Sequence, residues 1–524
     1  MNSFTVKGWD LERFEPEYVR SRIQEASRHG INTISLSHEI VHNAEEILFD
    51  WHRYKHLSNF CDEAHKFGMR VFLWNAQINN PPEHLVNTAE DPGCFYLNFD
   101  HPDLLSWLYD RYQRVVERVP HIDGIILGLT EGEWQIHRWP EDPYYYNMQK
   151  RKTLSALPPD ERIARVVRTV YESLTSKGKS LLVRDFLRTP DEMNAFKKAI
   201  DTLPNDIGVY SKCVPNDWQY KYPPHPLLGK FPNRTQIMEL DLYNETGGND
   251  HSILLAPDYY KEQLQRARDC GLAGAIPRLD DGFATHRGTA REFNLYAYNQ
   301  LIHDPNADTD PMWMAFFEPY YGNAEAAKVA IQCLKRSFDM VCANAYTLGF
   351  WTGRLACSIK YTDSHLTHHS SARWSGGKRF SDIEHLLFEG GPEARSQSVT
   401  EKKEAECLAS DSLRELEKAK ALFSDEKYLE ITGYFEESQQ QARINQVWVD
   451  AYYALRYIRN YPENIRAKED ARATLQACHT FLNTQPTTPK TRYEKSLSES
   501  EWNRFRFANL PEFVNEMETA LKAV

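Results

Sequence analysis

Three carboxylates in the first half of the chain lie within or soon after short apolar runs. Glu131 follows GIILGL, Asp217 lies in the stretch YSKCVPND, and Glu239 lies within QIMELD. Hydrolysis of a glycosidic bond needs one carboxylic acid to protonate the departing oxygen and one carboxylate to activate water or attack carbon directly. Glu131 as the acid, with Asp217 or Glu239 as its partner, satisfies this need.

Each of these carboxylates also has an ordinary structural interpretation. Glu131 lies in a TEG turn that is a plausible helix entry, so it is also a candidate helix cap. Asp217 lies in a loop beside a proline, where a simple turn aspartate is expected as well. Glu239 differs, because a charge inside an apolar strand is costly unless it is paired. For Glu239, a functional role is favoured over a structural one.

Cations and aromatic side chains lie at the ends of neighbouring apolar runs. Arg184 in SLLVRD and Lys212 in IGVYSK are candidates for substrate binding, and equally for structural pairing with Asp185 or Glu239. Four further substrate-binding candidates are Trp74, Asn75, Trp134 and His38. The two tryptophans are also candidate core residues, because large cores use aromatic rings as readily as sugar sites do.

The elements that would position these residues alternate between strand and helix up to about Asp304. The apolar, β-branched runs are SFTVKG, NTISLS, RVFLWN, GIILGL, SLLVRD, IGVYSK, QIMELD and GAIPRL, and amphipathic stretches of helical length separate them. Several of these stretches end in Gly directly before the next run, as expected for a left-handed helix cap.

This pattern predicts an α/β fold, a closed (β/α)8 TIM barrel whose active site lies at the C-terminal ends of the strands. An open doubly wound sheet is the structural alternative. It is disfavoured because no Gly-rich phosphate loop follows the first run.

Beyond about Pro305 the strand pattern disappears and long amphipathic helices replace it. The last two long helices, separated by a Ser-Asp turn, predict an antiparallel helical hairpin. We therefore expect a catalytic barrel over residues 1–304 and a helical C-terminal domain over residues 305–524. Its apolar faces are expected to dimerise, to close over the cleft, or to cover one side of the barrel.

Composition limits the classes of partner and cofactor. The 524 residues carry a formal net charge of -12, so neither nucleic acid nor a membrane is an expected partner. The sequence contains no apolar stretch of membrane-spanning length, and its start lacks the features of a signal peptide. We expect a cytoplasmic protein, or a periplasmic one if a leader has been removed. The nine cysteines are scattered and include no CxxC pair, so no metal site is suggested, and we expect no other cofactor. The paired carboxylates make an oligosaccharide the expected substrate.

Taken in order, the motifs resemble those of the α-glucuronidases of glycoside hydrolase family 67. The similar segments are YLNFDHPDLLSWLYDRYQRVVERVPHIDGIIL, TEG, VRDFL, YSKCVPNDWQYKYPPHPLLGKFPNRTQIMELDLY, HSILLAPDYYKEQL, GLAGAI and NLYAYNQLIHDP. The similarity as a whole covers roughly residues 15–350. Each motif is weak by itself, but their order and spacing together are fairly specific.

The resemblance implies an inverting hydrolase that removes glucuronic acid from the end of a xylan-derived oligosaccharide. Glu131 of TEG then matches the general acid, and Asp217 and Glu239 match the water-activating side. Arg184 and Lys212 match cations that hold the sugar carboxylate. A planar guanidinium together with an ammonium is a suitable clamp for a uronate.

The chain departs from the family at three places. Leu127 stands where the family has a lysine four residues before the acid, and the acid turn continues as TEGEW without the usual proline-rich segment. The first predicted strand begins almost at once, so we expect the family's N-terminal β-sandwich to be missing.

Two alternatives to an inverting hydrolase of terminal uronic acids stay open. The first is a retaining glycosidase that uses the same carboxylates on a neutral or another acidic glycan, with carboxyl groups about 5–5.5 Å apart instead of about 6.5–9.5 Å. The second is a non-catalytic carbohydrate-binding barrel, against which the presence of all three matching carboxylates argues.

Overall fold

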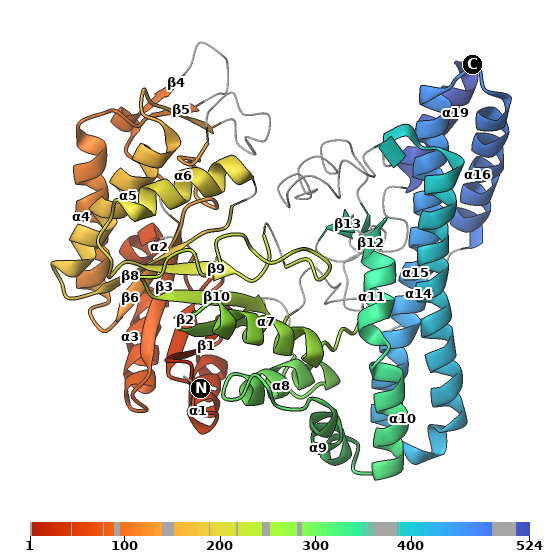
Figure 1. Cartoon of the computed structure of the whole chain (residues 1–524), viewed down its shortest axis with the longest axis horizontal. Helices are drawn as coiled ribbons and strands as arrows, with labels where there is room; N and C mark the ends of the chain where they lie inside the picture. Colours follow the sequence, from red (N-terminus) through yellow and green to blue (C-terminus); the bar gives the residue numbers. More distant parts are fainter. Residues whose placement is uncertain are drawn as a thin grey trace.

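The computed structural model describes residues 3–42, 44–76, 78–88, 95–138, 151–187, 189–215, 218–243, 252–279, 286–348, 350–351, 353–354, 358–359, 385–386, 388–484 and 510–523. Eight strands among them close into a barrel (Figure 1). They are β1 (Val6–Leu11), β2 (Thr33–Leu36), β3 (Arg70–Ala76), β6 (Gly124–Gly128), β8 (Ser180–Arg184), β9 (Gly208–Lys212), β10 (Gln236–Asp241) and β11 (Gly274–Arg278).

Every strand of the ring pairs in parallel with its neighbours in chain order, and β11 pairs with β1 to close it. All eight apolar runs contribute a strand, so the predicted TIM barrel is confirmed. Because the strands are parallel, their C-terminal ends meet at one end of the ring, which we call the mouth.

Helices follow the strands and surround the barrel (Figure 1). They are α1 (Pro16–Arg28), α2 (Ala44–Phe49), α3 (Trp51–His65), α4 (Asp103–Arg118), α5 (Pro159–Thr175), α6 (Pro190–Asp201), α7 (Pro257–Asp269) and α8 (Phe293–Leu301). Gly30, Gly68, Gly178 and Gly271 end four of these helices with φ values of 65–74°. The predicted left-handed caps are therefore present, at positions where a Cβ would be strained.

The first strand begins and ends later than the run SFTVKG predicts. It covers Val6–Leu11 instead of residues 3–8, because its pairing with β2 and β11 continues to Leu11 and Asp10. The hydrogen-bonded ladder, and not the apolar run, sets the end of the strand. As a result, the strand carries the acidic residues of WDLE to the mouth.

Short strands also occur where the sequence predicts loops or helices. A three-stranded sheet of β4 (Val86–Thr88), β5 (Phe95–Asn98) and β7 (Arg151–Leu154) joins the loops after β3 and β6. Beyond Pro305, where no strand was expected, four two-residue strands form two small antiparallel pairs: β12 (Tyr346–Thr347), β13 (Phe350–Trp351), β14 (Gly353–Arg354) and β15 (Ser358–Ile359).

The barrel strands present one face to the interior and one to the helices. The interior cluster consists of Phe72, Trp74, Ile126, Leu182, Tyr210, Ile237 and Ile276. Because side chains alternate along a strand, the positions two residues further toward the mouth share this inward face. They include Gly128, Arg184, Lys212, Glu239 and Arg278. A charged layer therefore lies directly above the apolar one.

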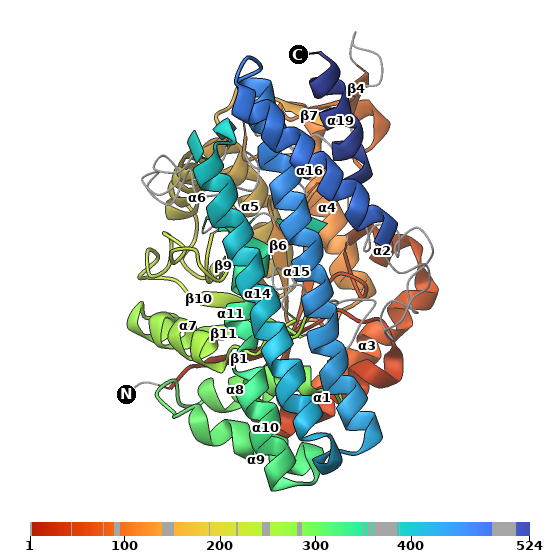
Figure 2. The ribbon, with the colours of Figure 1, turned by 90° about the vertical axis from the view of Figure 1, so that its right-hand side faces the viewer.

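The C-terminal region is helical, as predicted. Its long helices are α9 (Asp310–Tyr321), α10 (Ala324–Leu334), α11 (Ser337–Ala345), α14 (Pro392–Lys418), α15 (Asp425–Asn460), α16 (Ile465–Thr484) and α19 (Leu510–Lys522). Helices α14 and α15 lie side by side, as Figure 2 shows, and form the expected hairpin around Ser424, whose side chain caps α15.

The loops that leave the mouth after β9, β10 and β11 are bonded to this helical region. The backbone N–H of Tyr220 donates to the hydroxyl of Tyr346 at 2.6 Å, and that of Leu255 donates to Ser337 Oγ at 3.0 Å. A further bond of 3.1 Å joins the N–H of Ala290 to Glu430 on α15. The helical region therefore borders the mouth on the side of these three strands.

None of the helices described here combines the length and the apolar character needed to cross a bilayer. The seven cysteines in the described part of the chain are all free thiols.

Candidate active site

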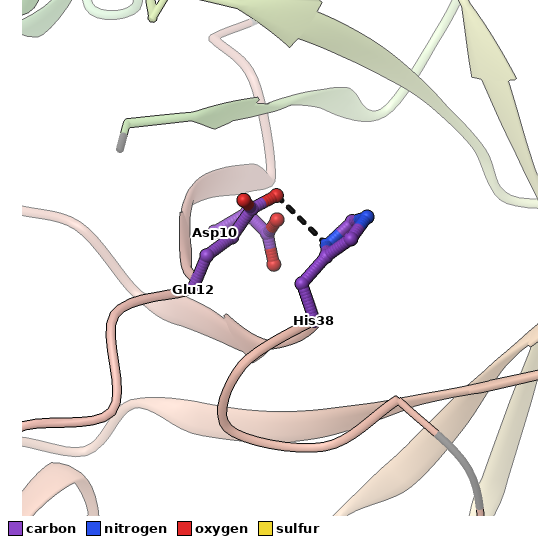
Figure 3. Close-up of side chains that lie close together, drawn as sticks. All are labelled: Asp10, Glu12 and His38. Atoms are coloured by element: carbon purple, nitrogen blue, oxygen red, sulfur yellow. Dashed lines mark ion pairs between the residues drawn. The ribbon is translucent and has the colours of Figure 1, made fainter. Parts of the chain in front are cut away.

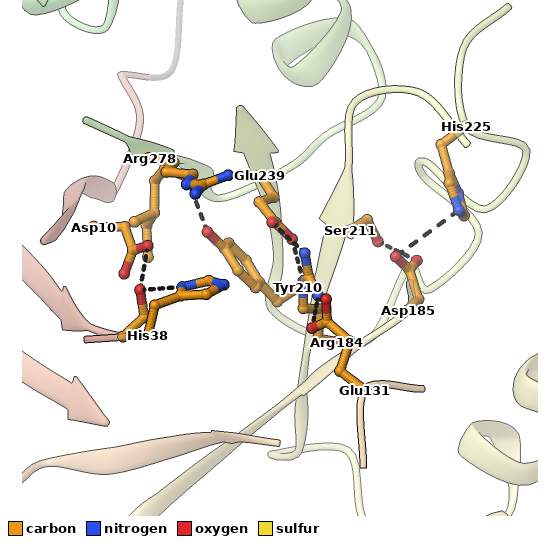
Figure 4. A network of polar contacts seen from close by, with 12 residues as sticks. Asp10, His38, Glu131, Arg184, Asp185, Tyr210, Ser211, His225, Glu239 and Arg278 are labelled. Carbon is orange, nitrogen blue, oxygen red and sulfur yellow. Dashed lines mark hydrogen bonds and ion pairs between the residues drawn. The ribbon is translucent and has the colours of Figure 1, made fainter. Parts of the chain in front are cut away.

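Arg184 joins two of the predicted catalytic carboxylates at the mouth (Figure 4). Its Nη1 lies 2.6 Å from Oε2 of Glu131, while its Nε and Nη2 each lie 2.6 Å from one oxygen of Glu239. Arg184 ends β8 and Glu239 lies in β10, both on the inward face, and Glu131 lies in the loop after β6. The structure therefore brings these three predicted residues into one cluster.

The carboxylates of Glu131 and Glu239 differ in their exposure to solvent. About a third of the Glu131 side chain, 31%, is exposed, against 5% for Glu239. Burial tends to raise the pKa of Glu131, but Arg184 in the first place, with smaller contributions from nearby cations, holds the pKa below its ordinary value. In the free protein Glu131 is therefore ionised, and it can donate a proton only after Arg184 has released it.

Lys212 lies on β9 opposite Glu239 in the strand register. Its Nζ lies 3.8 Å from the ring centre of Phe186 and 3.4 Å from that of Trp218, which are cation–π distances. The ammonium is buried. The two predicted cations thus occupy adjacent strands of the mouth.

Trp74, Asn75 and Trp134 lie in different surroundings. The ring of Trp74 faces the interior, 4.3 Å from Cζ of Arg184 and 5.2 Å from the ring of His38. Asn75 follows it on the opposite face of β3 and is completely buried. Trp134 packs in the core outside the ring. Of these three candidates, the structure brings only Trp74 to the cluster of Glu131, Arg184 and Glu239.

The remaining positions named by the family resemblance are Asp217 and Leu127. Asp217 lies outside the described residues. Leu127 points away from the interior and packs against the helices, whereas Gly128 is the residue of β6 that faces the mouth beside Trp74. A lysine at position 127 would therefore not reach the mouth with this backbone.

The loop that carries Glu131 is fixed by hydrogen bonds to neighbouring segments. The backbone N–H of Glu133 donates to Asn79 Oδ1 at 2.8 Å, and the carboxylate of Glu133 accepts from the N–H of Asn80 at 2.8 Å. Further along the loop, Arg162 Nε donates to the carbonyl of Ile136 at 3.0 Å. These bonds hold Glu131 in place without engaging its own side chain.

A second cluster of charged side chains lies at the mouth, and among its members only His38 was predicted from the sequence. Glu12 Oε1 lies 2.8 Å from Nδ1 of His38 (Figure 3) and 2.6 Å from Nε of Arg278. Ser37 Oγ donates to Oδ2 of Asp10 at 2.7 Å. The overlooked signal is the pair of acids in WDLE, because a spacing of two places both on one face of a strand.

The charges of this second group are interdependent. Burial and the nearby Glu12 raise the pKa of Asp10 to about 7. Burial would raise the pKa of Glu12 as well, but Arg278 and His38 lower it below its ordinary value. Burial alone would lower the pKa of His38, and Glu12 outweighs this and raises it. Near neutral pH, Glu12 is therefore ionised, and its charge favours the protonated forms of both Asp10 and His38.

The same three side chains have the spacing of metal ligands, since one ligand atom from each of Asp10, Glu12 and His38 lies within 4.8 Å of the others. However, Arg278 already places a cation 2.6 Å from Glu12. A divalent ion bound there would be repelled by that charge. The charge of Arg278 therefore disfavours a metal ion at this group.

Asp185, the residue after Arg184, belongs to a separate buried network with Ser211 and His225 (Figure 4). Ser211 Oγ donates to its Oδ2 at 2.6 Å and accepts in turn from Gln236, while Nε2 of His225 lies 3.9 Å from its Oδ1. Burial raises the pKa of Asp185 to about 7. Burial and Lys212 lower the pKa of His225 to about 3, so the imidazole is neutral.

We expect Asp185→Asn to reduce the pH dependence of stability. The folded-state pKa of about 7 exceeds the unfolded value of about 3.9, so the wild-type free energy of unfolding falls as pH rises between these values. The amide oxygen can still accept from Ser211 and the amide does not ionise, so this fall in the free energy of unfolding, on the order of 3 kcal/mol, disappears. Urea unfolding at pH 5 and pH 8 measures this.

The control for this prediction is Asp110→Asn, at an exposed position on α4, which should keep the wild-type difference between the two pH values. If Asp185→Asn keeps it too, Asp185 is not the group that binds the proton.

Comparison with known proteins shows that residues 12–270 match the family described as the glycosyl hydrolase family 67 middle domain. Among solved structures, the chain is similar to a GH138 enzyme targeting pectin rhamnogalacturonan II, with a TM-score of 0.58 and 12% sequence identity over 99% of this chain and 84% of that one. It is also similar to an O-GlcNAc hydrolase from Thermobaculum terrenum, with a TM-score of 0.46 and 11% identity over 99% and 94% of the two chains. No curated protein matches it. At these identities the structural likeness concerns the fold alone.

Proposed function

We propose that this chain, a glycoside hydrolase whose residues 12–270 match the glycosyl hydrolase family 67 middle domain, removes a terminal uronic acid, or a related sugar, from an oligosaccharide with inversion. The observation that carries the proposal is Arg184, which lies between Glu131 and Glu239 with Lys212 on the adjacent strand. A guanidinium next to an ammonium suits a sugar carboxylate in both charge and shape.

A sugar carboxylate at the mouth would compete with Glu131 for Arg184. The contact through Nη1 is the accessible one, because Glu131 is partly exposed and Glu239 is buried. When the sugar takes Nη1, Glu131 loses the main cation that lowers its pKa, and the sugar ring also shields it from water. Both changes raise the pKa. Substrate binding thereby turns Glu131 from a carboxylate into the general acid.

The base in this scheme is Glu239 or Asp217. Glu239 faces the interior from β10 and stays bonded to Nε and Nη2 of Arg184. The base accepts a proton from water as the water oxygen bonds to C1, while Glu131 gives its proton to the departing oxygen.

One observation favours the retaining alternative. Glu131 is ionised and partly exposed in the free protein, which is the state that a carboxylate nucleophile requires. In that mechanism Glu131 would bond to C1, and water would then hydrolyse the glycosyl-enzyme.

The test is hydrolysis of uronate-capped oligosaccharides beside the same compounds with the carboxyl group reduced to an alcohol, with product anomers followed by proton NMR. We expect release of the uronic acid with inverted configuration. The reduced compounds should have kcat/KM values about 10- to 100-fold lower, because a charged hydrogen bond is lost.

Each other outcome has a definite meaning. Equal rates on both compounds would reject the uronate as the recognised group. A product of retained configuration would replace inversion with the retaining mechanism. Binding without turnover of either compound would indicate a carbohydrate-binding barrel.

A further inference from the structure

Glu131 is ionised before the substrate enters, so the proton that it later gives to the leaving group has to reach it at a mouth already filled by sugar. Resting on the proposed function, we propose that His38, oriented by Glu12, supplies this proton and acts as a positioning residue for the acid.

Among the described residues, the side chains that bond to the imidazole of His38 do so through one nitrogen. Its Nδ1 lies 2.8 Å from Glu12 Oε1 and 2.9 Å from Ser37 Oγ, so Nε2 is left for the mouth. About a third of the side chain, 30%, is exposed. The backbone of His38 is left-handed, with φ of 46°, a conformation that is uncommon outside Gly and that Asn, Asp and His adopt more often than the other residues.

The aromatic ring of Trp74 lies next to both His38 and the cluster of Glu131, Arg184 and Glu239. The ring of Trp74 contacts His38 at 5.2 Å and Cζ of Arg184 at 4.3 Å. In Figure 4, Tyr210 lies between the two groups. The charge of Glu131 helps to raise the pKa of His38, and the charge of His38 helps to lower the pKa of Glu131.

The charged and titratable groups around His38 come from four parts of the barrel: Asp10 and Glu12 at the end of β1, Arg278 at the end of β11, Glu131 after β6, and His42 after β2. The two glutamates favour the imidazolium and Arg278 opposes it. The net effect raises the pKa of His38, while the pKa of Asp10 is about 7. Burial and Glu12 thus favour the protonated form of Asp10, and the neighbouring carboxylates favour that of His38.

In the proposed step, one proton passes from His38 through Glu131 to the leaving group. Once the sugar holds Arg184, the proton leaves Nε2 of His38 and joins the oxygen of Glu131 that Arg184 did not hold, directly or across one water molecule. Glu131 passes it to the glycosidic oxygen as the C1–O bond breaks and the electron pair moves to that oxygen. The base has taken one proton from the attacking water, and solvent returns one to His38 after product release.

The principal test variant is His38→Asn, because asparagine tolerates the left-handed backbone and its amide can still bond to Glu12, while Nε2 is lost. We expect kcat on a uronate-capped oligosaccharide to fall about 10- to 100-fold, and kcat on a 2,4-dinitrophenyl uronide, whose leaving group needs no proton, to fall less than about threefold. Glu12→Gln should give the same pattern in weaker form. His479→Gln, a histidine far away on α16, should change neither rate.

A merely structural role would slow both substrates equally, and that result would overturn the proposal. An independent readout uses no substrate: proton NMR titration of His38 should give a pKa above the ordinary value that falls in Glu12→Gln and in Glu131→Gln. An unshifted value in the wild type, or no response in Glu12→Gln, would overturn the proposal even if the enzyme hydrolyses uronides. Loss of activity with a chelator and its recovery with Zn²⁺ or Mn²⁺ would also overturn the proposal, because the group would then bind a metal. If the NMR result holds and no uronide is cleaved, the proposed function fails instead.

Discussion

Glu131→Gln should lower kcat on a uronate-capped oligosaccharide by about 100- to 10,000-fold, the range that loss of a positioned general acid produces. The amide keeps the size of the side chain and can still accept a hydrogen bond from Arg184, but it has no proton to give. Binding should remain measurable, because the contacts of Arg184 and Lys212 with the sugar do not depend on Glu131. Steady-state kinetics together with isothermal titration calorimetry separate the two effects.

Two comparisons make this prediction specific. Glu172→Gln, on the exposed surface of α5, should leave kcat unchanged. Glu131→Gln should lose much less activity on a 2,4-dinitrophenyl uronide if Glu131 is the acid, and should be inactive on both substrates if it is the nucleophile of a retaining mechanism. Full activity of Glu131→Gln on the oligosaccharide would remove the residue from either role.

Arg184→Met should destabilise the protein by about 3–5 kcal/mol at pH 7. The guanidinium is buried and bonded to both Glu131 and Glu239, so its loss leaves Glu239 as a buried carboxylate without its partner. Urea unfolding measures the difference in free energy. The variant should also lose the preference for uronate-capped substrates.

The pH dependence of this effect follows from Glu131. The pKa of Glu131 is lowered in the folded protein, so its pairing with Arg184 stabilises the fold at pH values above the unfolded pKa of about 4.3. This stabilisation is lost as the pH falls through the folded-state pKa. The difference between wild type and Arg184→Met should therefore be smaller at pH 4 than at pH 7.

The matched control is Arg165→Met at an exposed position on α5, which should change stability by less than about 0.5 kcal/mol. The double variant Arg184→Met with Glu239→Gln should recover part of the loss, because it removes the unpaired charge. A loss below about 1 kcal/mol in Arg184→Met, or no recovery in the double variant, would show that the cluster is not an electrostatic unit.

The fold was largely predictable because its signals are local. Each of the eight apolar runs is continuous, as expected for strands covered on both faces, and the glycines at Gly30, Gly68, Gly178 and Gly271 mark turns whose left-handed backbone depends on that residue alone. Glu239 could also be recognised locally, since a charge within an apolar strand needs a partner. Placing Glu131, Arg184 and Lys212 near strand ends then sufficed to expect them at one end of the barrel.

Other candidates depended on facts that no local pattern contains. Asn75 and Trp134 satisfy the sequence criterion as well as Trp74 does, yet strand alternation and loop packing turn them away from the mouth. Asp10 and Glu12 fall outside the first apolar run, and only pairing with β2 and β11 extends the strand to carry them inward.

The sequence by itself thus determined which strands form the ring and which charged side chains stand at their ends, because apolar periodicity and glycine punctuation are properties of neighbouring residues. Only the tertiary structure decided that one guanidinium bridges Glu131 and Glu239, and that Glu12 sits between His38 and Arg278. These partners come from different strands and from the loops that follow them. Their protonation is set by distance and burial, and both exist only once the ring has closed.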